Sequence, residues 1–198
     1  MEYPHWLLVI FAVWWLVWAI RPADRRVWLA ENSVAITLVL FLIAIYPYFR
    51  FSNLSYTLSV VLLFLHAVGG HYMYSKVPYD RWSKRLLGRT ISELFGFKRN
   101  HYDRLVHFAF GILMAQPARE LLQHYAQPRE GWSEVLPVCV IMSLAMAFEL
   151  IEAVIAAALG GGAGQEYLAA QGDEWDAHKD MALAALGAII AMIIAGIA

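Results

Sequence analysis

Pairs of acidic and histidine residues recur at helical spacing in three places along this chain of 198 residues. The pairs are Asp103 with His107, Glu149 with Glu152, and Asp176 with Asp180. Side chains three or four positions apart lie on one face of an α-helix, so each pair would direct two potential ligands the same way. Carboxylates and imidazoles that project from several helices into a bundle core are a common design for a metal site. The spacing therefore predicts a metal site shared by three helices.

A fourth polar stretch, residues 69–72, adds His71 at the end of an apolar run. The candidate ligands are then rich in oxygen and include imidazole, which favours zinc, manganese or iron over copper or an all-oxygen calcium site. The seven candidate ligands of this divalent metal are His71, Asp103, His107, Glu149, Glu152, Asp176 and Asp180. Seven ligands are more than one tetrahedral ion needs. Either only a subset of them binds the ion, or two ions bind, or some of these residues only orient the ligands.

Such a metal would activate a bound water or polarise the oxygen of a scissile bond, which is the chemistry of ester and phosphoester cleavage. Glu149 and Glu152 are the candidate catalytic residues, since either could act as general base. Arg104 and Lys179 lie near the acids and would hold an anionic headgroup, with Tyr72 as a third candidate substrate-binding residue. No Gly-x-Ser-x-Gly motif occurs, so a nucleophilic serine is not indicated.

The same residues also admit a structural interpretation. Glu149 and Glu152 could form buried ion pairs with Arg104 or Lys179, and Asp176 could cap a helix. Three hypotheses therefore stand: a metal-dependent hydrolase or transferase acting on a lipid-linked or amphiphilic substrate, a non-catalytic structural or sensory protein, and a small transporter. Transporter sites usually lie at the bilayer midplane between internal repeats, and no repeat is visible in this sequence.

The elements that must position these residues are apolar. The chain is 61 % hydrophobic and 16 % charged, with a mean hydropathy of +0.54, whereas soluble domains carry roughly 25 % charged residues. Six apolar runs cover residues 6–20, 33–49, 54–68, 105–115, 135–159 and 181–198. With their flanks they approach the roughly 20 residues that cross a bilayer as a helix. The sequence predicts an all-α, polytopic membrane bundle of about six transmembrane helices, forming one transmembrane domain over residues 1–198.

Other classes of protein are excluded by composition. The single cysteine, Cys139, lies inside an apolar run and rules out an intrachain disulfide or a cysteine-based metal cluster. The net charge is −1 and no basic run with interleaved aromatic residues occurs, so nucleic acid is not an expected partner. The first apolar run is followed rather than preceded by arginines, which indicates a retained helix instead of a cleaved signal peptide.

The distribution of basic residues predicts the orientation in the membrane. The connections after the first, third and fifth apolar runs hold 12 lysines and arginines, and those after the second and fourth hold 3. Because basic residues accumulate on the cytoplasmic side, we expect both termini outside and the three basic connections inside. All four polar stretches then fall in the cytoplasmic leaflet. Ionisable residues at such depths are costly and tend to mark functional sites.

A further segment, residues 78–97, is too charged to span a membrane. Apolar residues recur there at near-helical spacing with basic residues between them, which predicts an amphipathic helix in the inner membrane interface. Its expected partner is membrane lipid, since a basic face is attracted to anionic headgroups. The glycine-rich run at residues 160–164 is expected to be a flexible connector that opens a loop over the site.

The polar stretches resemble a known family. Three of them, residues 65–72 (LHAVGGHY), 100–108 (NHYDRLVHF) and 171–176 (QGDEWD) continued by 179–181 (KDM), resemble the YjdF-like family of uncharacterised bacterial inner-membrane proteins, over most of the chain. A weaker similarity to the VanZ-like pattern rests on Asp103-Arg104, His107-Phe108 and the later acids, although Arg104 replaces a lysine and Ala184 an asparagine of that pattern. The resemblance implies a multi-pass protein of the bacterial inner (cytoplasmic) membrane, without indicating a reaction.

Overall fold

The computed structural model describes residues 2–197, apart from the side chain of Glu166, and it is all-helical. Helices make up 79 % of the chain, and no strand occurs among the described residues. The helical elements are α1 (Tyr3–Trp18), α2 (Arg25–Ile45), α3 (Asn53–Tyr72), the 3-10 helix η1 (Tyr74–Lys76), α4 (Tyr79–Leu87), α5 (Ile91–Phe95), α6 (Tyr102–Tyr125), α7 (Trp132–Leu159), α8 (Gly161–Tyr167) and α9 (Asp176–Ile197). The predicted all-α class is confirmed.

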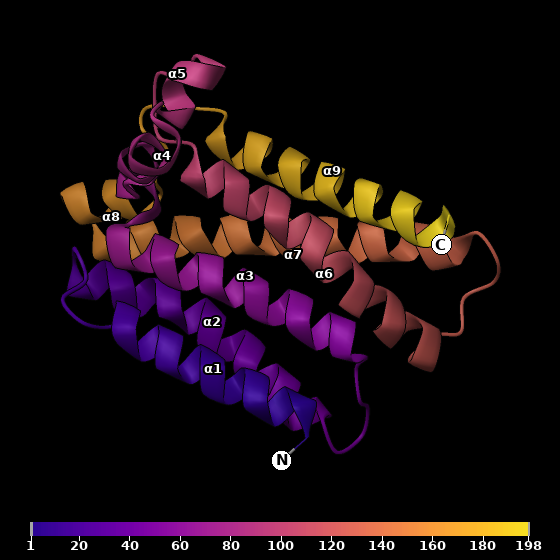
Figure 1. The fold of residues 1–198 in the computed structure, drawn as a ribbon. Coiled ribbons are helices and arrows are strands. Elements are labelled where there is room, and N and C mark those ends of the chain that lie inside the picture. Colours follow the sequence, from indigo (N-terminus) through magenta and orange to yellow (C-terminus); the bar gives the residue numbers. More distant parts are fainter. Residues whose placement is uncertain (1, 198) are drawn as a thin grey trace.

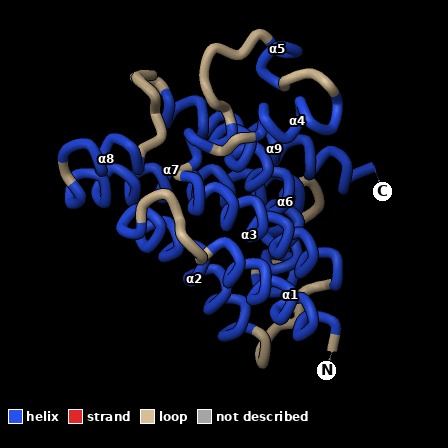
Figure 2. The backbone as a smooth tube through the Cα atoms, turned by 60° about the vertical axis from the view of Figure 1, so that its left-hand side comes forward, coloured by secondary structure: helices blue, strands red, loops and turns tan. Residues whose placement is uncertain are grey.

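The six long helices α1, α2, α3, α6, α7 and α9 correspond one to one to the six apolar runs and form an elongated bundle (Figure 1). Helix α6 lies at its centre and contacts α9 most extensively, then α3 and α7, whereas α1 and α2 pack on α3. The short helices α4, α5 and α8 gather at one end, and both ends of the chain lie toward the other (Figures 1 and 2). The polar stretches belong to helix ends at the α4, α5 and α8 end.

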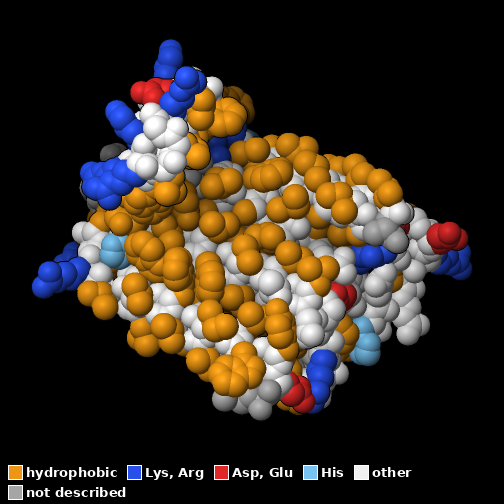
Figure 3. Space-filling model, in the orientation of Figure 1, with side chains coloured by type: hydrophobic (Ala, Val, Ile, Leu, Met, Phe, Trp, Pro, Cys, Tyr) orange, Lys and Arg blue, Asp and Glu red, His pale blue; other side chains and the backbone are white. Residues whose placement is uncertain are grey.

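Within the part of the chain that the structure describes, four helices, α2, α3, α7 and α9, are long and apolar enough to cross a membrane. Helix α1 is apolar but has only 16 residues, and α6 carries charged residues near both ends, so the predicted count of six spans is not confirmed. Large apolar side chains point outward along these helices, and charged side chains collect at the two ends of the molecule (Figure 3). Such an outward-facing apolar belt is typical of helices in contact with lipid.

The centre of the bundle depends on small residues. A Cβ atom at Gly111 of α6 would lie 2.0 Å from the carbonyl oxygen of Ala184, and one at Gly187 of α9 would lie 2.4 Å from that of Phe108. Backbones can approach this closely only where side chains are absent, which is the usual device for packing helices in a membrane. Because α6 and α9 begin at the same end of the bundle, their first turns lie side by side (Figure 1).

Two local predictions were wrong. Residues 78–97 form two short helices rather than one, because Gly88 adopts a left-handed φ of +75° that ends α4, and Thr90 then caps α5 with a reciprocal bond to Glu93. Basic side chains cover this part of the molecule (Figure 3). The glycine run is not an open loop either. It turns at Gly160 and continues as α8, where the absent side chain of Gly164 allows close packing on Ala156 of α7.

Candidate functional site

Three of the predicted ligands meet between α6 and α9. Asp103, His107 and Asp180 each offer one ligand atom, and these atoms all lie within 4.8 Å of one another. His107 and Asp180 are buried, and His107 Nε2 lies 3.6 Å from Asp103 Oδ1. All three occupy the first two turns of their helices, where the close packing of α6 on α9 brings them face to face. We call these three residues the trio.

Glu149 of α7 approaches the trio from a third helix. Its Oε1 lies 3.5 Å from His107 Nε2, yet this oxygen is buried without a hydrogen-bond partner, and so is Oδ1 of Asp180. Buried carboxylate oxygens are nearly always hydrogen-bonded, so two unpartnered ones beside an imidazole require an explanation. A bound cation would explain both oxygens, because they could coordinate it or have their negative charge neutralised by it at short range.

Two further buried acids surround the trio. Glu152, one turn after Glu149, interacts electrostatically with Asp103 and with Glu31 of α2. Glu31 is only 1 % exposed, and its Oε2 has no hydrogen-bond partner. Glu31 is not among the residues predicted from the sequence, and it precedes the predicted apolar run of residues 33–49. An acid inside a helix that is otherwise apolar was the available signal.

Neighbouring side chains fix the backbone around these acids. The Tyr74 hydroxyl lies 2.5 Å from His66 Nδ1, and His66 Nε2 lies 3.0 Å from the carbonyl oxygen of Glu31. A side chain at Gly69 would meet the Tyr74 ring at 2.6 Å, so a glycine is needed there. His66 is thereby fully engaged in hydrogen bonds that tie α3 to α2, which agrees with a structural role.

An ion-pair network covers the trio at the end of the bundle. Arg104 Nη2 lies 2.6 Å from Asp173 Oδ2 and 3.0 Å from Asp176 Oδ1, and Arg99 also pairs with both acids. Lys179 Nζ contacts Asp173 Oδ2 at 2.5 Å. The hydrogen bond from Lys179, with further bonds from Trp175 and Arg104, holds the pKa of Asp173 well below its usual range.

Three of the predicted site residues, Arg104, Asp176 and Lys179, take part in this network. Arg104 pairs with Asp173 and Asp176, and Lys179 pairs with Asp173, whereas the described residues show no ion pair of either cation with Glu149 or Glu152. Asp176 is buried under the two arginines, so its predicted role as a ligand competes with these ion pairs. We call Arg99, Arg104, Asp173, Asp176 and Lys179 the cap.

Backbone hydrogen bonds hold the cap in place. The Asn100 backbone N–H donates to Gln171 Oε1 at 3.1 Å, and Gln171 Nε2 donates back to the Asn100 carbonyl at 2.8 Å. Asn100 Nδ2 also donates to the Val77 carbonyl, which connects the loop after η1. Arg99 reaches the Ala170 carbonyl in the same region. These hydrogen bonds therefore join the segment before α6 to the segment between α8 and α9, at the end of the bundle where the trio lies.

The structure does not bring His71 or Tyr72 into the trio. His71 Nδ1 lies 2.8 Å from the Trp18 carbonyl, and its ring contacts the Trp18 indole edge to face. The Tyr72 ring packs between Trp18 and Trp82. Both side chains join α3 to α1 and α4, so the geometry gives them no contact with the proposed ligands among the described residues.

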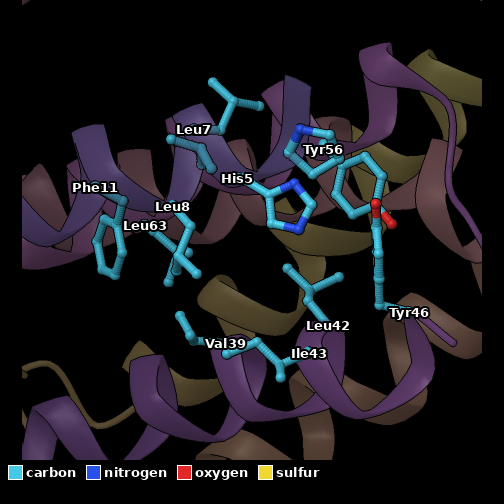
Figure 4. A pocket seen from close by; sticks show the side chains of 12 residues that line it. His5, Leu7, Leu8, Phe11, Val39, Leu42, Ile43, Tyr46, Tyr56 and Leu63 are labelled. Atoms are coloured by element: carbon cyan, nitrogen blue, oxygen red, sulfur yellow. The ribbon is translucent and has the colours of Figure 1, made fainter. Parts of the chain in front are cut away.

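Apolar hollows also occur away from the trio among the described residues. One, of about 220 Å³, lies between α1, α2 and α3 near the N-terminus and is lined by aliphatic side chains with the rings of His5, Tyr46 and Tyr56 (Figure 4). Another, of about 300 Å³, lies between α7 and α9. Its lining residues Met146 and Met181 are close in sequence to Glu149 and Asp180, and none of the trio lines it.

Comparison with known proteins gives two matches. The model of a family described as "Predicted membrane protein (DUF2238)" matches residues 3–198. Inner membrane protein YjdF of Escherichia coli (strain K12) is 38 % identical over 180 residues, which cover 88 % of this chain and 79 % of that protein. No solved structure matches the chain. The predicted resemblance is thus confirmed, and the relative is a protein of the inner membrane.

Proposed function

This chain belongs to the DUF2238 family of predicted membrane proteins, and we propose that it is a divalent-metal-dependent hydrolase or transferase. Its substrate is a lipid-linked or amphiphilic molecule at the cytoplasmic leaflet. The observation that supports this most is the trio of Asp103, His107 and Asp180, with ligand atoms within 4.8 Å of one another and unpartnered carboxylate oxygens at their side. Unsatisfied buried oxygens are costly unless a ligand binds them.

The donor set fits zinc, manganese or iron, because one imidazole nitrogen and several carboxylate oxygens converge. When bound, the metal would act as a Lewis acid on an ester or phosphoester oxygen. Asp103, His107 and Asp180 would hold it. Glu149, with a free oxygen beside His107, would accept the proton of the attacking water or hydroxyl group.

Two features support an amphiphilic substrate. The groove between α7 and α9 is lined by Met146 and Met181, which lie near Glu149 and Asp180 in the sequence, and by other small or apolar residues of these two apolar helices, which suits an acyl or isoprenoid chain. At the end of the bundle, Arg99, Arg104 and Lys179 would bind an anionic headgroup if it displaced Asp173. The cytoplasmic location of this end rests on the 12-to-3 asymmetry of basic residues.

One observation favours a second candidate function. The three cations of the cap are all engaged in ion pairs, as a non-catalytic structural or sensory network would require. Several ion pairs of the cap share partly buried carboxylates, so such a network would contribute to stability. The two functions differ in the role of the acids beside His107. In an enzyme these acids take part in catalysis, whereas in a structural or sensory protein they only stabilise the fold.

The test is Glu149→Gln, which preserves volume and removes the charge, with Glu134→Gln as the control. Glu134 lies at the opposite end of the same helix, 3.4 Å from Arg119. Protein purified without chelator is analysed for metal and screened against phospholipids, undecaprenyl-linked substrates and acyl esters. We expect metal in the wild type, turnover of one class, and loss of turnover without unfolding in Glu149→Gln only. A metal-free wild type in which Glu149→Gln lowers the melting temperature would support the structural role instead.

A further inference from the structure

We propose that the centre binds a second divalent cation between Glu31 of α2 and Glu152 of α7, with Asp103 shared by both cations. This inference rests on the proposed function and deepens it. The first cation has an imidazole ligand from His107. The second would be bound by oxygen atoms alone.

One apolar cluster relates the positions of Glu31 and Glu152. Val27, Met73, Ala156 and Tyr167 form one buried apolar cluster that joins α2, α7 and α8. Glu31 lies one helical turn after Val27, and Glu152 lies one turn before Ala156. Because α2 and α7 run in opposite directions, both steps lead from this cluster toward the middle of the bundle, where the two carboxylates face the same space.

The main charges that act on Glu31 and Glu152 are all negative. Glu31 interacts electrostatically with Asp103, and the main electrostatic partners of Glu152 are Asp103, Glu31, Glu149 and Asp180. Glu31 is 1 % exposed and Glu152 is 7 % exposed, so solvent does little to screen this repulsion. Carboxylates gathered in this way need a cation or protons to remain together.

Unpartnered polar atoms indicate where the ligand would lie. Oε2 of Glu31 and the hydroxyl of Tyr167, whose residue is also 1 % exposed, have no hydrogen-bond partner. Tyr167 interacts electrostatically with both Glu31 and Glu152, so its hydroxyl belongs to the same space. These two unsatisfied oxygens, one from α2 and one from α8, make a set of hard oxygen donors together with the carboxylate of Glu152. Manganese and magnesium prefer such donors.

A second cation narrows the substrate class. Paired metal ions about 3.5–4 Å apart stabilise both the attacking and the leaving oxygen in phosphoryl transfer. Asp103, which takes part in the trio and interacts with Glu31 and Glu152, is placed to bridge such a pair. Among the candidate amphiphiles, a lipid phosphoester is therefore the substrate class that this centre suits.

The experiment measures Mn²⁺ bound per chain by equilibrium dialysis of the detergent-solubilised protein, together with its melting temperature with and without Mn²⁺. We expect two Mn²⁺ per chain in the wild type and one in Glu31→Gln. The control Glu120→Gln should keep two, because Glu120 bonds to Ser52 and Ser55 at the opposite end of the bundle. Without Mn²⁺, Glu31→Gln should melt at the same temperature as the wild type or higher, since it removes an uncompensated charge.

Other outcomes overturn the inference. If Glu31→Gln binds as many Mn²⁺ as the wild type, the second site is wrong, and the proposed function survives as long as His107→Ala loses the remaining ion. A wild type that binds no Mn²⁺, zinc or iron overturns both. If Glu31→Gln fails to fold, the variant Tyr167→Phe tests the second site instead, because this substitution removes only the unpartnered hydroxyl group. Weaker binding of one of two Mn²⁺ supports the second site, and unchanged binding of both contradicts it.

Discussion

The Cα atom of Gly111 lies directly against the backbone of Ala184, so that a Cβ there would come within 2.0 Å of the Ala184 carbonyl oxygen. The two positions are 73 residues apart in the sequence. The same offset relates His107 to Asp180, one turn earlier on each of two helices that begin at the same end of the bundle. The close contact between two residues without functional groups therefore sets the register of two proposed metal ligands.

Gly111→Ala should separate α6 from α9 and weaken the site. Its methyl group cannot be accommodated without moving backbone, and overpacking of this kind costs typically about 1–3 kcal/mol. The matched control is Gly162→Ala, where a Cβ would meet nothing within 4 Å. We expect a lower melting temperature and lower metal content for Gly111→Ala alone, measured by thermal unfolding in detergent and elemental analysis. Equal behaviour of the two variants would contradict the register argument.

His107→Ala should lower the metal content, whereas His124→Ala should not. His107 is the only imidazole in the trio, and His124 packs against the rings of Phe49 and Tyr125 at the opposite end of α6. Chelator treatment of the wild type should reduce its melting temperature toward that of His107→Ala, because a ligand that binds only the folded state stabilises it. Elemental analysis and melting curves check both expectations, and equal metal in the two variants would favour a structural network.

The ion pairs of the cap should contribute less stability at low pH. The pKa of Asp173 is held below its usual range by Lys179, so its ion pairs contribute stability that is fully present above the ordinary aspartate pKa. This contribution is lost as the pH falls below about 4 toward the depressed value in the folded state. Asp173→Asn should reduce the melting temperature at pH 7 and flatten its decline in acid. The exposed acid Glu130 provides the control Glu130→Gln, and a decline that Asp173→Asn leaves unchanged would show that other groups cause it.

His101 should add a second pH dependence at higher pH. Burial and the neighbouring Arg104 and Arg99 lower its pKa, so the unfolded chain binds this proton more readily than the folded one. Stability should therefore rise as the pH increases toward the ordinary histidine value of about 6.5 and stay constant above it. His101→Gln should remove this rise, as melting temperatures between pH 5 and 8 would reveal. A profile identical to that of the wild type would exclude His101 as its source.

The predicted orientation can be tested with single cysteines in a Cys139→Ser background. Glu130→Cys lies in the connection between α6 and α7, and Gly162→Cys lies in α8 at the opposite end of the bundle. If basic connections are cytoplasmic, a membrane-impermeant maleimide added to intact cells should label position 130 and not position 162. Labelling of position 162 alone would reverse the orientation and move the proposed site to the outer leaflet.

The sequence alone determined the features that depend on local spacing. Hydrophobic runs located the six long helices, because each must present apolar side chains to its surroundings. Helical periodicity paired Asp103 with His107, since residues four apart share a face whatever the rest of the fold does. The family resemblance was also carried by continuous stretches of residues, such as 100–108.

Only the tertiary structure decided which of these faces meet. It added Glu31, a buried acid one turn from the apolar cluster that joins α2 to α7 and α8, and it placed His71 against Trp18 instead. It also paired Arg104 with Asp173, 69 residues away. Spacing along one helix fixes the direction of a side chain relative to that helix, but the rotation and depth of one helix against another depend on contacts such as Gly111 with Ala184. Those contacts join distant segments, and no local pattern specifies them.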